Sequence, residues 1–277
     1  MLVYSDQLIK KAMKKRYAVG GFNIFNLEST IAVIEASEKL KSPALVQISE
    51  STLTKYFKPE QIVPSVISMI KKSKSKLALH LDHGKSLEVV KIAVKNGFTS
   101  IMFDGSLFPF EKNIKLTKKA VKIAKKKDKR ITVEGEIGII GRNKSEKSNM
   151  TDPEDAKIFT EETGVDMLAI SIGNVHGLYK GKPNLDFKRL KKIRRIVKIP
   201  LVLHGGSGIP DDQIKRAIKL GISKINIFTE AKLAFYNGIK NNIKSTDDPR
   251  KILLAAKDEM KKLVMKKMRL LGSINKL

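Results

Sequence analysis

The sequence predicts an α/β protein built as a single (β/α)8 TIM barrel with an additional C-terminal helix. Short apolar or β-branched runs alternate eight times with longer amphipathic stretches, which is typical of a parallel sheet covered by helices. Eight repeats favour a closed barrel over an open doubly wound sheet, and a chain of 277 residues is long enough for one barrel. No Pro/Gly/Ser linker or long charge block divides the chain, so residues 1–277 are expected to form one domain.

The expected strands are the short apolar or β-branched runs. They are Ala18–Ile24, Ala44–Ser49, Lys76–Asp82, Ser100–Asp104, Arg130–Glu136, Met167–Ile172, Pro200–His204 and Lys224–Phe228. Between them, Leu27–Lys41 carries apolar residues at helical spacing, and Pro210 opens a second such helix over Pro210–Leu220. Gly97, Gly164 and Gly221 each end a helix shortly before the next strand, as left-handed C-caps do.

Two segments depart from the simple alternation. An extra helix is expected from about Pro249 to Leu271, beyond the eighth strand. The longest irregular stretch, Gly138–Asp152, follows the fifth strand and is rich in polar residues. A loop of that length in a compact domain is usually functional or mobile.

Composition limits the possible chemistry. Hydrophobic residues make up 42% of the chain, enough for a large core, and there is no Cys, so neither a disulfide nor a thiolate metal site can form. Any zinc would therefore be held by His and carboxylates. The N-terminus lacks the apolar region of a signal peptide, and apolar residues never run for eighteen positions. These features predict a soluble cytoplasmic protein that does not span a membrane.

The net charge of +27, from 55 basic and 28 acidic residues, raises the alternative of a nucleic-acid-binding protein. Only nine of the basic residues are Arg, although bidentate recognition of bases and phosphates favours Arg. The lysines are spread over nearly every expected helix, which indicates solvated helix faces. Nucleic acid is therefore the less favoured partner, and the positive field would also attract a phosphorylated substrate.

Uncommon polar residues gather where the expected strands end, which is where barrels place their active sites. The chain has four histidines, at positions 80, 83, 176 and 204, and all four lie near strand ends. His83, His176 and His204 are each next to Gly, which lets ligand and backbone approach closely. Three histidines on different strand ends suit a tetrahedral zinc ion with one open position. His80 lies two residues before Asp82 on the same strand face and is expected to play a supporting structural role.

Other strand ends suggest an anion site and carry carboxylates that point either all into the barrel or all out of it where they share one strand face. The run Gly205-Gly206-Ser207 after the seventh strand and Asn226–Thr229 after the eighth flank the usual phosphate pocket of barrels. Asp104, Glu134 and Glu136 face the same mouth, and Glu134 and Glu136 share one strand face. If those two point inward, burial would be costly without a cation partner.

In several consecutive motifs the sequence resembles the class II, metal-dependent fructose- and tagatose-bisphosphate aldolases, over almost the whole chain. The motifs that carry the resemblance are Phe22-Asn23, His80-Leu81-Asp82-His83-Gly84, Gly97-Phe98-Thr99-Ser100-Ile101-Met102, Val133-Glu134-Gly135-Glu136-Ile137-Gly138, Val175-His176-Gly177-Leu178-Tyr179, Leu203-His204-Gly205-Gly206-Ser207-Gly208-Ile209 and Lys224-Ile225-Asn226. The family likeness implies a zinc-dependent aldolase that reversibly cleaves fructose 1,6-bisphosphate to dihydroxyacetone phosphate and glyceraldehyde 3-phosphate in glycolysis or gluconeogenesis.

The resemblance also implies roles for individual residues. The catalytic zinc would be held by His83, His176 and His204. Asp82 would act as acid and base on the C4 oxygen. Asp104 and Glu136 match positions that hold a second divalent metal in some relatives. The implied substrate-binding positions are Asn23, Ser49, Gly177, Gly205, Gly206, Ser207, Asn226, Ile227, Phe228, Thr229 and Arg250. A monovalent cation, Na⁺ or K⁺, would be held by backbone carbonyls of Val175, Gly177, Gly205 and Ser207.

Two of these expectations carry further consequences. Relatives have an acidic, glycine-rich loop after the fifth strand whose glutamate exchanges the C3 proton; here the loop is shortened, and Glu146 is its only carboxylate between Gly138 and Met150. Glu146 is thus the candidate for that role. Arg250 matches an arginine that reaches a neighbouring subunit's active site, so a homodimer or homotetramer is expected.

Alternatives within the barrel class remain. A Schiff-base aldolase needs a lysine on an inner strand, often the sixth, and Met167–Ile172 contains none. A metal hydrolase barrel would carry an early His-x-His pair, which the first strand lacks. Tagatose 1,6-bisphosphate differs from the fructose isomer only at C4, and no single residue decides between them. The fructose isomer is favoured because glycolysis is the commoner need.

Overall fold

Eight parallel strands form a closed barrel in which each strand pairs with its neighbours in sequence order, from β1 round to β8. This computed structural model describes residues 1–141, 149–177, 179, 181 and 183–277. The strands are β1 (Val19–Asn23), β2 (Ala44–Ser49), β3 (Leu77–Gly84), β4 (Ser100–Phe103), β5 (Thr132–Ile137), β6 (Met167–Ile170), β7 (Leu201–Leu203) and β8 (Ile222–Ile227). The predicted TIM barrel is confirmed, and each predicted strand end lies within about two residues of the observed one, the usual uncertainty of element ends.

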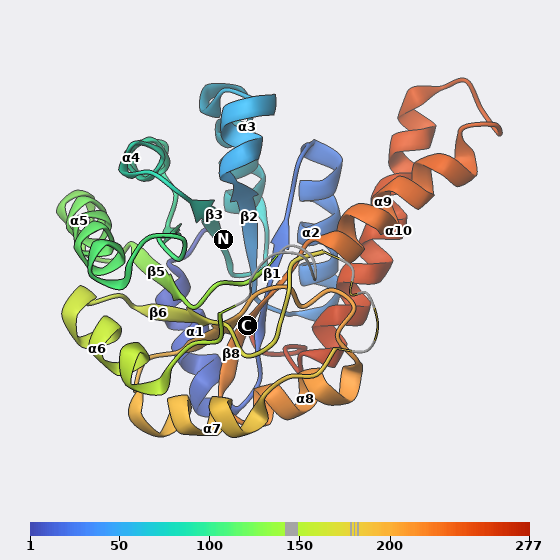
Figure 1. Cartoon of the computed structure of the whole chain (residues 1–277). Coiled ribbons are helices and arrows are strands. Elements are labelled where there is room, and N and C mark those ends of the chain that lie inside the picture. The colour runs from blue at the N-terminus through green and yellow to red at the C-terminus, as the bar shows by residue number, and fades with distance from the viewer. Residues whose placement is uncertain (142–148, 178, 180, 182) are drawn as a thin grey trace.

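Helices surround the barrel and connect successive strands (Figure 1). They are α1 (Ser5–Lys15), α2 (Leu27–Leu40), the π-helix η1 (Thr52–Tyr56), α3 (Pro59–Lys72), α4 (Leu87–Lys95), α5 (Phe110–Lys127), α6 (Pro153–Thr163), α7 (Phe187–Ile196), α8 (Asp211–Lys219), α9 (Thr229–Asn242) and α10 (Pro249–Leu270). Gly97, Gly164 and Gly221 adopt positive φ angles of 85°, 66° and 117°, as expected for residues that end a helix. Among the described residues, no helix is long and apolar enough to cross a membrane.

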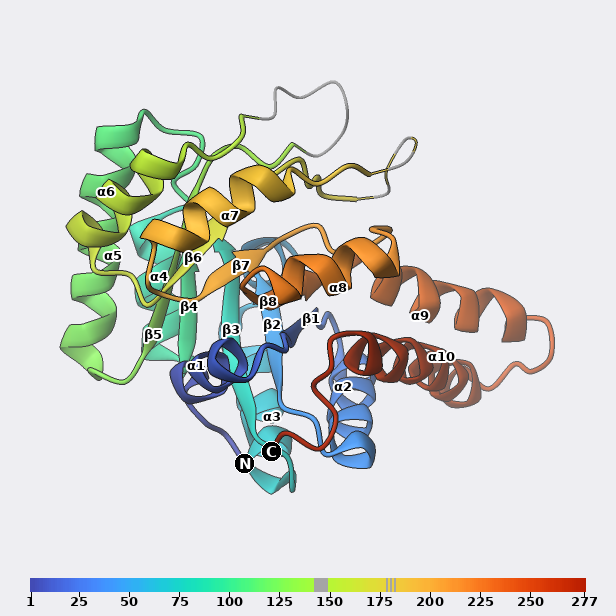
Figure 2. The same cartoon turned by 90° about the horizontal axis from the view of Figure 1, so that it is seen from below.

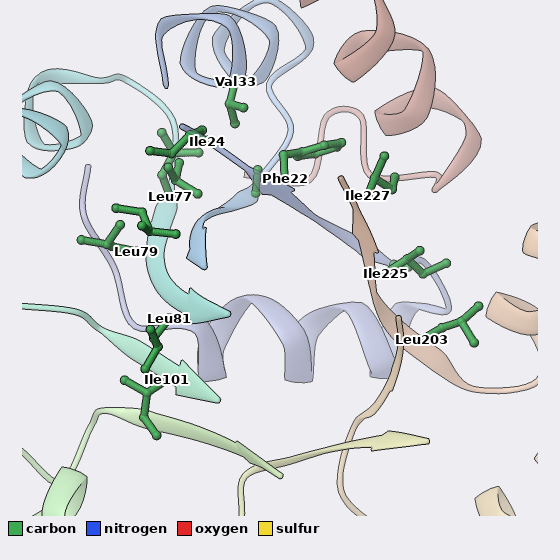
Figure 3. Packing of buried hydrophobic residues seen from close by; sticks show 14 of the residues in the cluster. Phe22, Ile24, Val33, Leu77, Leu79, Leu81, Ile101, Leu203, Ile225 and Ile227 are labelled. Carbon is green, nitrogen blue, oxygen red and sulfur yellow. The ribbon is translucent and has the colours of Figure 1, made fainter. Parts of the chain in front are cut away.

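The hydrophobic core has two parts, because the strands are buried on both faces. The larger part lies between the strands and the outer helices, and Figure 3 shows a portion of it that includes Phe22, Leu79, Ile101 and Ile225. The smaller part lies inside the barrel. It consists of Leu8, Ile9, Ala12, Tyr17, Val19, Leu45, Ala78, Met102, Met167, Ala169 and Val202. Since several of these residues belong to α1, that helix covers the N-terminal end of the barrel and leaves the opposite end for a site.

The C-terminal part of the chain forms a helical hairpin that extends from the barrel (Figures 1 and 2). The hairpin consists of α9 and α10, and α10 packs along both α9 and α2. The additional C-terminal helix predicted from Pro249 to Leu271 is confirmed. Glu35 of α2 ties the hairpin to the barrel through ion pairs with Lys257, at 3.1 Å, and with Lys261.

The loop after β5 begins and ends in backbone pairing. Ile139 N–H donates to Asn149 O at 2.8 Å, and Asn149 N–H donates back to Ile139 O at 3.2 Å. Thr151 then donates its hydroxyl to Ile137 O at 2.7 Å, which holds the returning chain against the end of β5. Residues 142–148, and with them Glu146, lie outside the described residues.

Candidate functional site

An irregularity in β3 brings two neighbouring residues into one site. Successive residues of a regular strand point to opposite faces, so Asp82 and His83 should diverge. The pairing of β3 with β4 shifts its register between Leu81 and Gly84, and His83 has a left-handed φ of 52°. A non-glycine residue in this conformation carries a strain of roughly 1–2 kcal/mol. Because of this bulge, both side chains reach the C-terminal end of the barrel.

Three histidine rings meet there, from β3 and from the loops after β6 and β7. The ring centroids are 4.8 Å apart for His83 and His176, 4.6 Å for His83 and His204, and 5.9 Å for His176 and His204. Each offers a nitrogen within 4.8 Å of the others. Two such nitrogens, His83 Nε2 and His204 Nδ1, are 2.9 Å apart. A tetrahedral ion with bonds of about 2.0–2.1 Å needs nitrogens about 3.3 Å apart, a small adjustment from this arrangement.

The second nitrogen of each ring has its own partner. His83 Nδ1 lies 2.8 Å from Asp104 Oδ2, and His204 Nε2 lies 2.8 Å from Glu134 Oε1. His176 Nδ1 lies 3.3 Å from the carbonyl oxygen of Ile140. Metal-bound histidines nearly always donate the other ring N–H in this way. The remaining nitrogen of His176, Nε2, is buried and has no hydrogen-bond partner among the described residues. Its lone pair is therefore free to bind a metal ion.

Electrostatics favour a positive charge at the centre of this cluster. Burial by itself lowers the pKa of His83, but attraction to Asp82, Asp104 and Glu136 outweighs it and raises the pKa to about 10. Burial, followed by repulsion from His83, lowers the pKa of His176 to about 4. The same two causes hold the pKa of His204 well below its ordinary value. His176 and His204 are therefore neutral at pH 7 and keep lone pairs that could bind a cation.

A second group of potential ligands shares His83. His83, Asp104 and Glu136 offer atoms within 4.8 Å of one another. Burial, followed by repulsion from Asp104, raises the pKa of Glu136 well above its usual range. Its Oε2 is buried without a hydrogen-bond partner in the described part of the chain. For Asp104, burial would raise the pKa, but hydrogen bonds from His83 and Ser106 lower it overall. These carboxylates could hold a second cation beside the histidine cluster.

Asp82 is held by three carboxamides. Asn23 donates to Oδ2 at 2.8 Å, while Gln47 and Asn226 each donate to Oδ1 at 2.9 Å. Burial alone would raise the pKa of Asp82, but attraction to the positive charges of His83 and Lys224 and the hydrogen bond from Asn23 lower it. Gln47 was not among the residues predicted from the sequence. The available signal was a glutamine inside the apolar run Ala44–Ile48, where it pairs in register with Asn23 and His80.

Below the histidines, the barrel interior contains a charged pair, of which Glu134 was predicted as a strand-end carboxylate but its partner Lys224 was not. Glu134 and Glu136 both point inward, and the cation partner of Glu134 is Lys224, with Nζ 2.7 Å from Oε2. Lys224 lies on the inner face of β8 and is fully buried. An inner-strand lysine is thus present, on β8 and not on β6, but its ammonium faces Glu134 and His80 within the core. His80 occupies the structural position expected of it, with Nδ1 2.7 Å from Ser100 Oγ.

The loops after β6, β7 and β8 meet beside the histidines. Gly205 has a φ of 63°, and a Cβ there would lie 2.0 Å from the carbonyl oxygen of Val175. Gly206 N–H donates to Asn226 O at 3.0 Å, and the Ser207 hydroxyl accepts from Glu230 N–H at 3.2 Å in the first turn of α9. The structure therefore brings the glycine-rich run and the end of β8 to the N-terminus of α9, where backbone N–H groups favour an anion.

The remaining predicted positions lie in different places. Ile227 ends β8, Phe228 precedes α9 and Thr229 begins it. Gly177 follows His176 with a positive φ of 94°. Ser49 ends β2 opposite Asp82 and contacts the hydroxyls of Ser51 and Thr52, each at 3.0 Å. Arg250 is not brought to the histidines of its own chain: it lies at the start of α10 and binds Asp248.

The chain is similar to known proteins over almost its whole length. Residues 3–276 match the family described as fructose-bisphosphate aldolase class-II. A fructose-bisphosphate aldolase from Geobacillus stearothermophilus is 40% identical over 285 residues, which cover 99% of this chain and 98% of that protein.

Solved structures agree as well. The YdjI aldolase from Escherichia coli K12 superposes with a TM-score of 0.91 at 37% identity, over 100% of this chain and 99% of that one. A putative fructose-1,6-bisphosphate aldolase from Coccidioides immitis gives a TM-score of 0.91 at 28% identity, over 98% and 96% of the two chains. The chain belongs to the class II fructose-bisphosphate aldolase family and is an aldolase, a carbon–carbon lyase.

Proposed function

We propose that this chain is a zinc-dependent aldolase that reversibly cleaves fructose 1,6-bisphosphate to dihydroxyacetone phosphate and glyceraldehyde 3-phosphate. The observation that carries the proposal is the convergence of three imidazoles whose outer nitrogens are already bound to Asp104, Glu134 and the Ile140 carbonyl. Class II aldolases are generally metal-dependent, and these residues fit a tetrahedral site with one open position. A role in glycolysis or gluconeogenesis would place the enzyme in the cytoplasm.

The zinc ligands would be His83, His176 and His204. When bound there, zinc would act as a Lewis acid on the C2 and C3 oxygens of the ketose, which stabilises the negative charge that develops as the C3–C4 bond breaks. Asp82 would accept the proton of the C4 hydroxyl while the C4–O bond becomes an aldehyde, and would return that proton in the condensation direction. Asn23, Gln47 and Asn226 keep its carboxylate aimed and ionised.

The phosphate of dihydroxyacetone phosphate would bind where the loops after β7 and β8 meet. Backbone groups of Gly177, Gly205–Ser207 and Asn226–Thr229 would bind it. Support comes from the contact of Ser207 Oγ with Glu230 N–H in the first turn of α9, whose dipole favours an anion. The carbonyls of Val175, Gly177, Gly205 and Ser207 would hold Na⁺ or K⁺. Support comes from the close approach of Val175 O to Gly205.

The other end of the substrate would involve Asn23, Ser49 and an arginine from a neighbouring subunit. Arg250 is 89% exposed at the start of α10, on the hairpin that extends from the barrel, so its side chain is available to a second copy. This role of Arg250 requires at least a homodimer, and a homotetramer would also provide it.

Glu146 would exchange the C3 proton, and Asp104 with Glu136 would hold a second divalent ion. Residues 1–277 would form one domain.

The test is a cleavage assay of the purified protein on fructose 1,6-bisphosphate and on tagatose 1,6-bisphosphate, with chelator and with zinc restored. We expect cleavage of the fructose isomer that a chelator abolishes and zinc restores, with no trapping by borohydride. Faster turnover of the tagatose isomer would instead favour the alternative substrate on the same scaffold. Chelator-resistant activity with borohydride trapping would overturn the zinc mechanism and point to Lys224 as a Schiff-base residue.

A further inference from the structure

The interior of the barrel, below the histidine cluster, holds a charged pair that the proposed reaction does not use. Glu134 of β5 and Lys224 of β8 are both 0% exposed, and Lys224 Nζ lies 2.7 Å from Glu134 Oε2. The other oxygen of Glu134 lies 2.8 Å from His204 Nε2. Through these contacts the pair meets the metal site at His204.

A contribution to folding stability does not explain why this buried ion pair is present. Two of its neighbours inside the barrel are apolar, because Met102 and Met167 lie opposite Glu134 in the sheet register. Removing two charges from water is costly, and replacing a buried ion pair with apolar residues of similar volume is often neutral or stabilising. The contact of Glu134 with His204 is therefore the feature of this pair that indicates a functional role.

That contact fixes the state of the His204 ring. A carboxylate oxygen can only accept a hydrogen bond, so the ring proton lies on Nε2 and the lone pair lies on Nδ1. His204 Nδ1 is also the atom that faces His83 Nε2, at 2.9 Å. We propose that Glu134, held by Lys224, is a positioning residue that keeps the Nδ1 lone pair of His204 directed at the metal. This inference rests on the proposed zinc site.

Lys224 is itself held in place from below. Its ammonium lies 3.4 Å from His80 Nε2, and His80 Nδ1 lies 2.7 Å from Ser100 Oγ. Ser5, at the start of α1, donates its hydroxyl to Ser100 Oγ at 2.9 Å. A column of polar side chains thus runs from α1, which covers the N-terminal end, to the metal site at the opposite end. These contacts hold the ammonium of Lys224 in one orientation, and the ammonium in turn holds the carboxylate of Glu134 in one orientation.

The experiment removes the charges in pairs, so that no single buried charge is left behind. The variant E134Q/K224M keeps an oxygen acceptor for His204 but removes the negative charge, while E134L/K224M removes the acceptor as well. Zinc affinity of the metal-free proteins is measured by competition with a chromophoric chelator, and folding is checked by circular dichroism and thermal melting. Loss of such a partner typically weakens metal binding 10–100-fold, so we expect losses of about 10-fold and about 100-fold, in that order.

A second readout reports the ring directly. Histidine-selective ¹⁵N NMR of the metal-free protein should show His204 with its proton on Nε2 in the wild type and a mixture of tautomers in E134L/K224M. The matched control is E35Q/K257M, which breaks the Lys–Glu pair between α2 and α10, outside the barrel. Its zinc affinity should stay within twofold of the wild type.

The outcomes separate this inference from the proposed function. Wild-type protein that binds no zinc would overturn the zinc proposal. Wild-type protein that binds zinc, with folded E134L/K224M within twofold of it, would overturn the positioning role alone. If E134L/K224M does not fold, E134Q/K224M decides, and a change of twofold or less overturns the inference.

Discussion

At the scale of single residues, the fold surrounds the buried carboxylate of Asp82 with amide donors. Its carboxylate accepts hydrogen bonds from three carboxamides that come from three different strands, β1, β2 and β8. Neutral N–H donors stabilise the ionised form without supplying a proton of their own. Asp82 therefore stays ionised at neutral pH although it is buried, as its proposed role as acceptor of the C4 hydroxyl proton requires.

The substitution D82N tests this role. Asparagine has nearly the same shape but cannot accept the C4 hydroxyl proton, so we expect kcat for cleavage to fall about 10²–10⁴-fold. Exchange of the C3 hydrogen of dihydroxyacetone phosphate with D₂O does not involve C4 and should persist, as followed by NMR. A folded D82N protein that keeps more than a tenth of the wild-type kcat would contradict the assignment.

At the scale of elements, the loops after β6 and β7 pack closely against each other because residue 205 is a glycine. A side chain at Gly205 would need a left-handed conformation and would place its Cβ 2.0 Å from the Val175 carbonyl oxygen. Both loops carry a histidine of the cluster, His176 and His204. A disturbance at Gly205 should therefore reach the proposed phosphate site and the histidines together.

The substitution G205A should both destabilise the protein and raise KM. Its matched control is G164A, since Gly164 has nearly the same φ of 66° but nothing within 4 Å of an added Cβ. G164A should cost only the roughly 1–2 kcal/mol of the left-handed conformation and leave kinetics unchanged. G205A should cost more, because the carbonyl must also move. Thermal melting and initial rates measure the two effects, and equal effects for both variants would contradict this account.

The contact between α2 and α10 has a pH dependence of its own. Burial by itself raises the pKa of Glu35, but hydrogen bonds from Lys261 and Lys257 outweigh it and lower the pKa below 4.5. The folded state thus favours the ionised carboxylate. Its contribution to stability is present above the unfolded pKa and is lost as pH falls through the folded pKa.

The substitution E35Q should therefore lower the melting temperature at pH 7 and have progressively less effect as pH is lowered below about 4. Because Glu35 is about a third exposed, with 34% of its side chain accessible, we expect an effect of about 0.2–1 kcal/mol at pH 7. Melting of wild type and E35Q across this pH range measures it. A difference that stays constant down to pH 3 would show that the loss is one of packing and not of charge.

At the scale of the whole molecule, the net charge of +27 is carried almost entirely on the surface. Among the lysines that the structure describes, Lys224, Lys257 and Lys267 are buried, and each has an acidic partner. The others are at least partly exposed, and most of them lie on the outer helices, as expected for solvated faces. Such a field steers anionic substrates towards the protein without forming a specific site.

This field should make the reaction sensitive to salt. We expect kcat/KM to fall as ionic strength rises from about 0.01 M to 0.15 M, since the Debye length shrinks from about 30 Å to 8 Å. Duplex DNA should bind at low salt and be released at physiological salt, as judged by fluorescence anisotropy. Tight binding to DNA that survives physiological salt would revive the nucleic-acid alternative.

The sequence alone determined the barrel, the C-terminal helix and the neighbourhood of the site. Hydrophobic periodicity is a local property, so eight strands could be located to within about two residues. The rule that parallel strands present their carboxyl ends at one edge then placed His83, His176, His204 and Asp104 near one another. The spacing of residues in the chain was enough for this, because the rule depends on strand direction and not on exact contacts.

Only the tertiary structure decided which side chains touch. Gln47 and Lys224 stand out in the sequence as polar residues inside apolar strands, but the groups they contact, Asp82 and Glu134, appear only in the folded barrel. The bulge that turns His83 beside Asp82 lies in the pairing of β3 with β4. The pairing of His204 with Glu134 joins strands far apart in the chain. Such contacts depend on the register of all eight strands in the closed barrel, which is a collective property that no local pattern encodes.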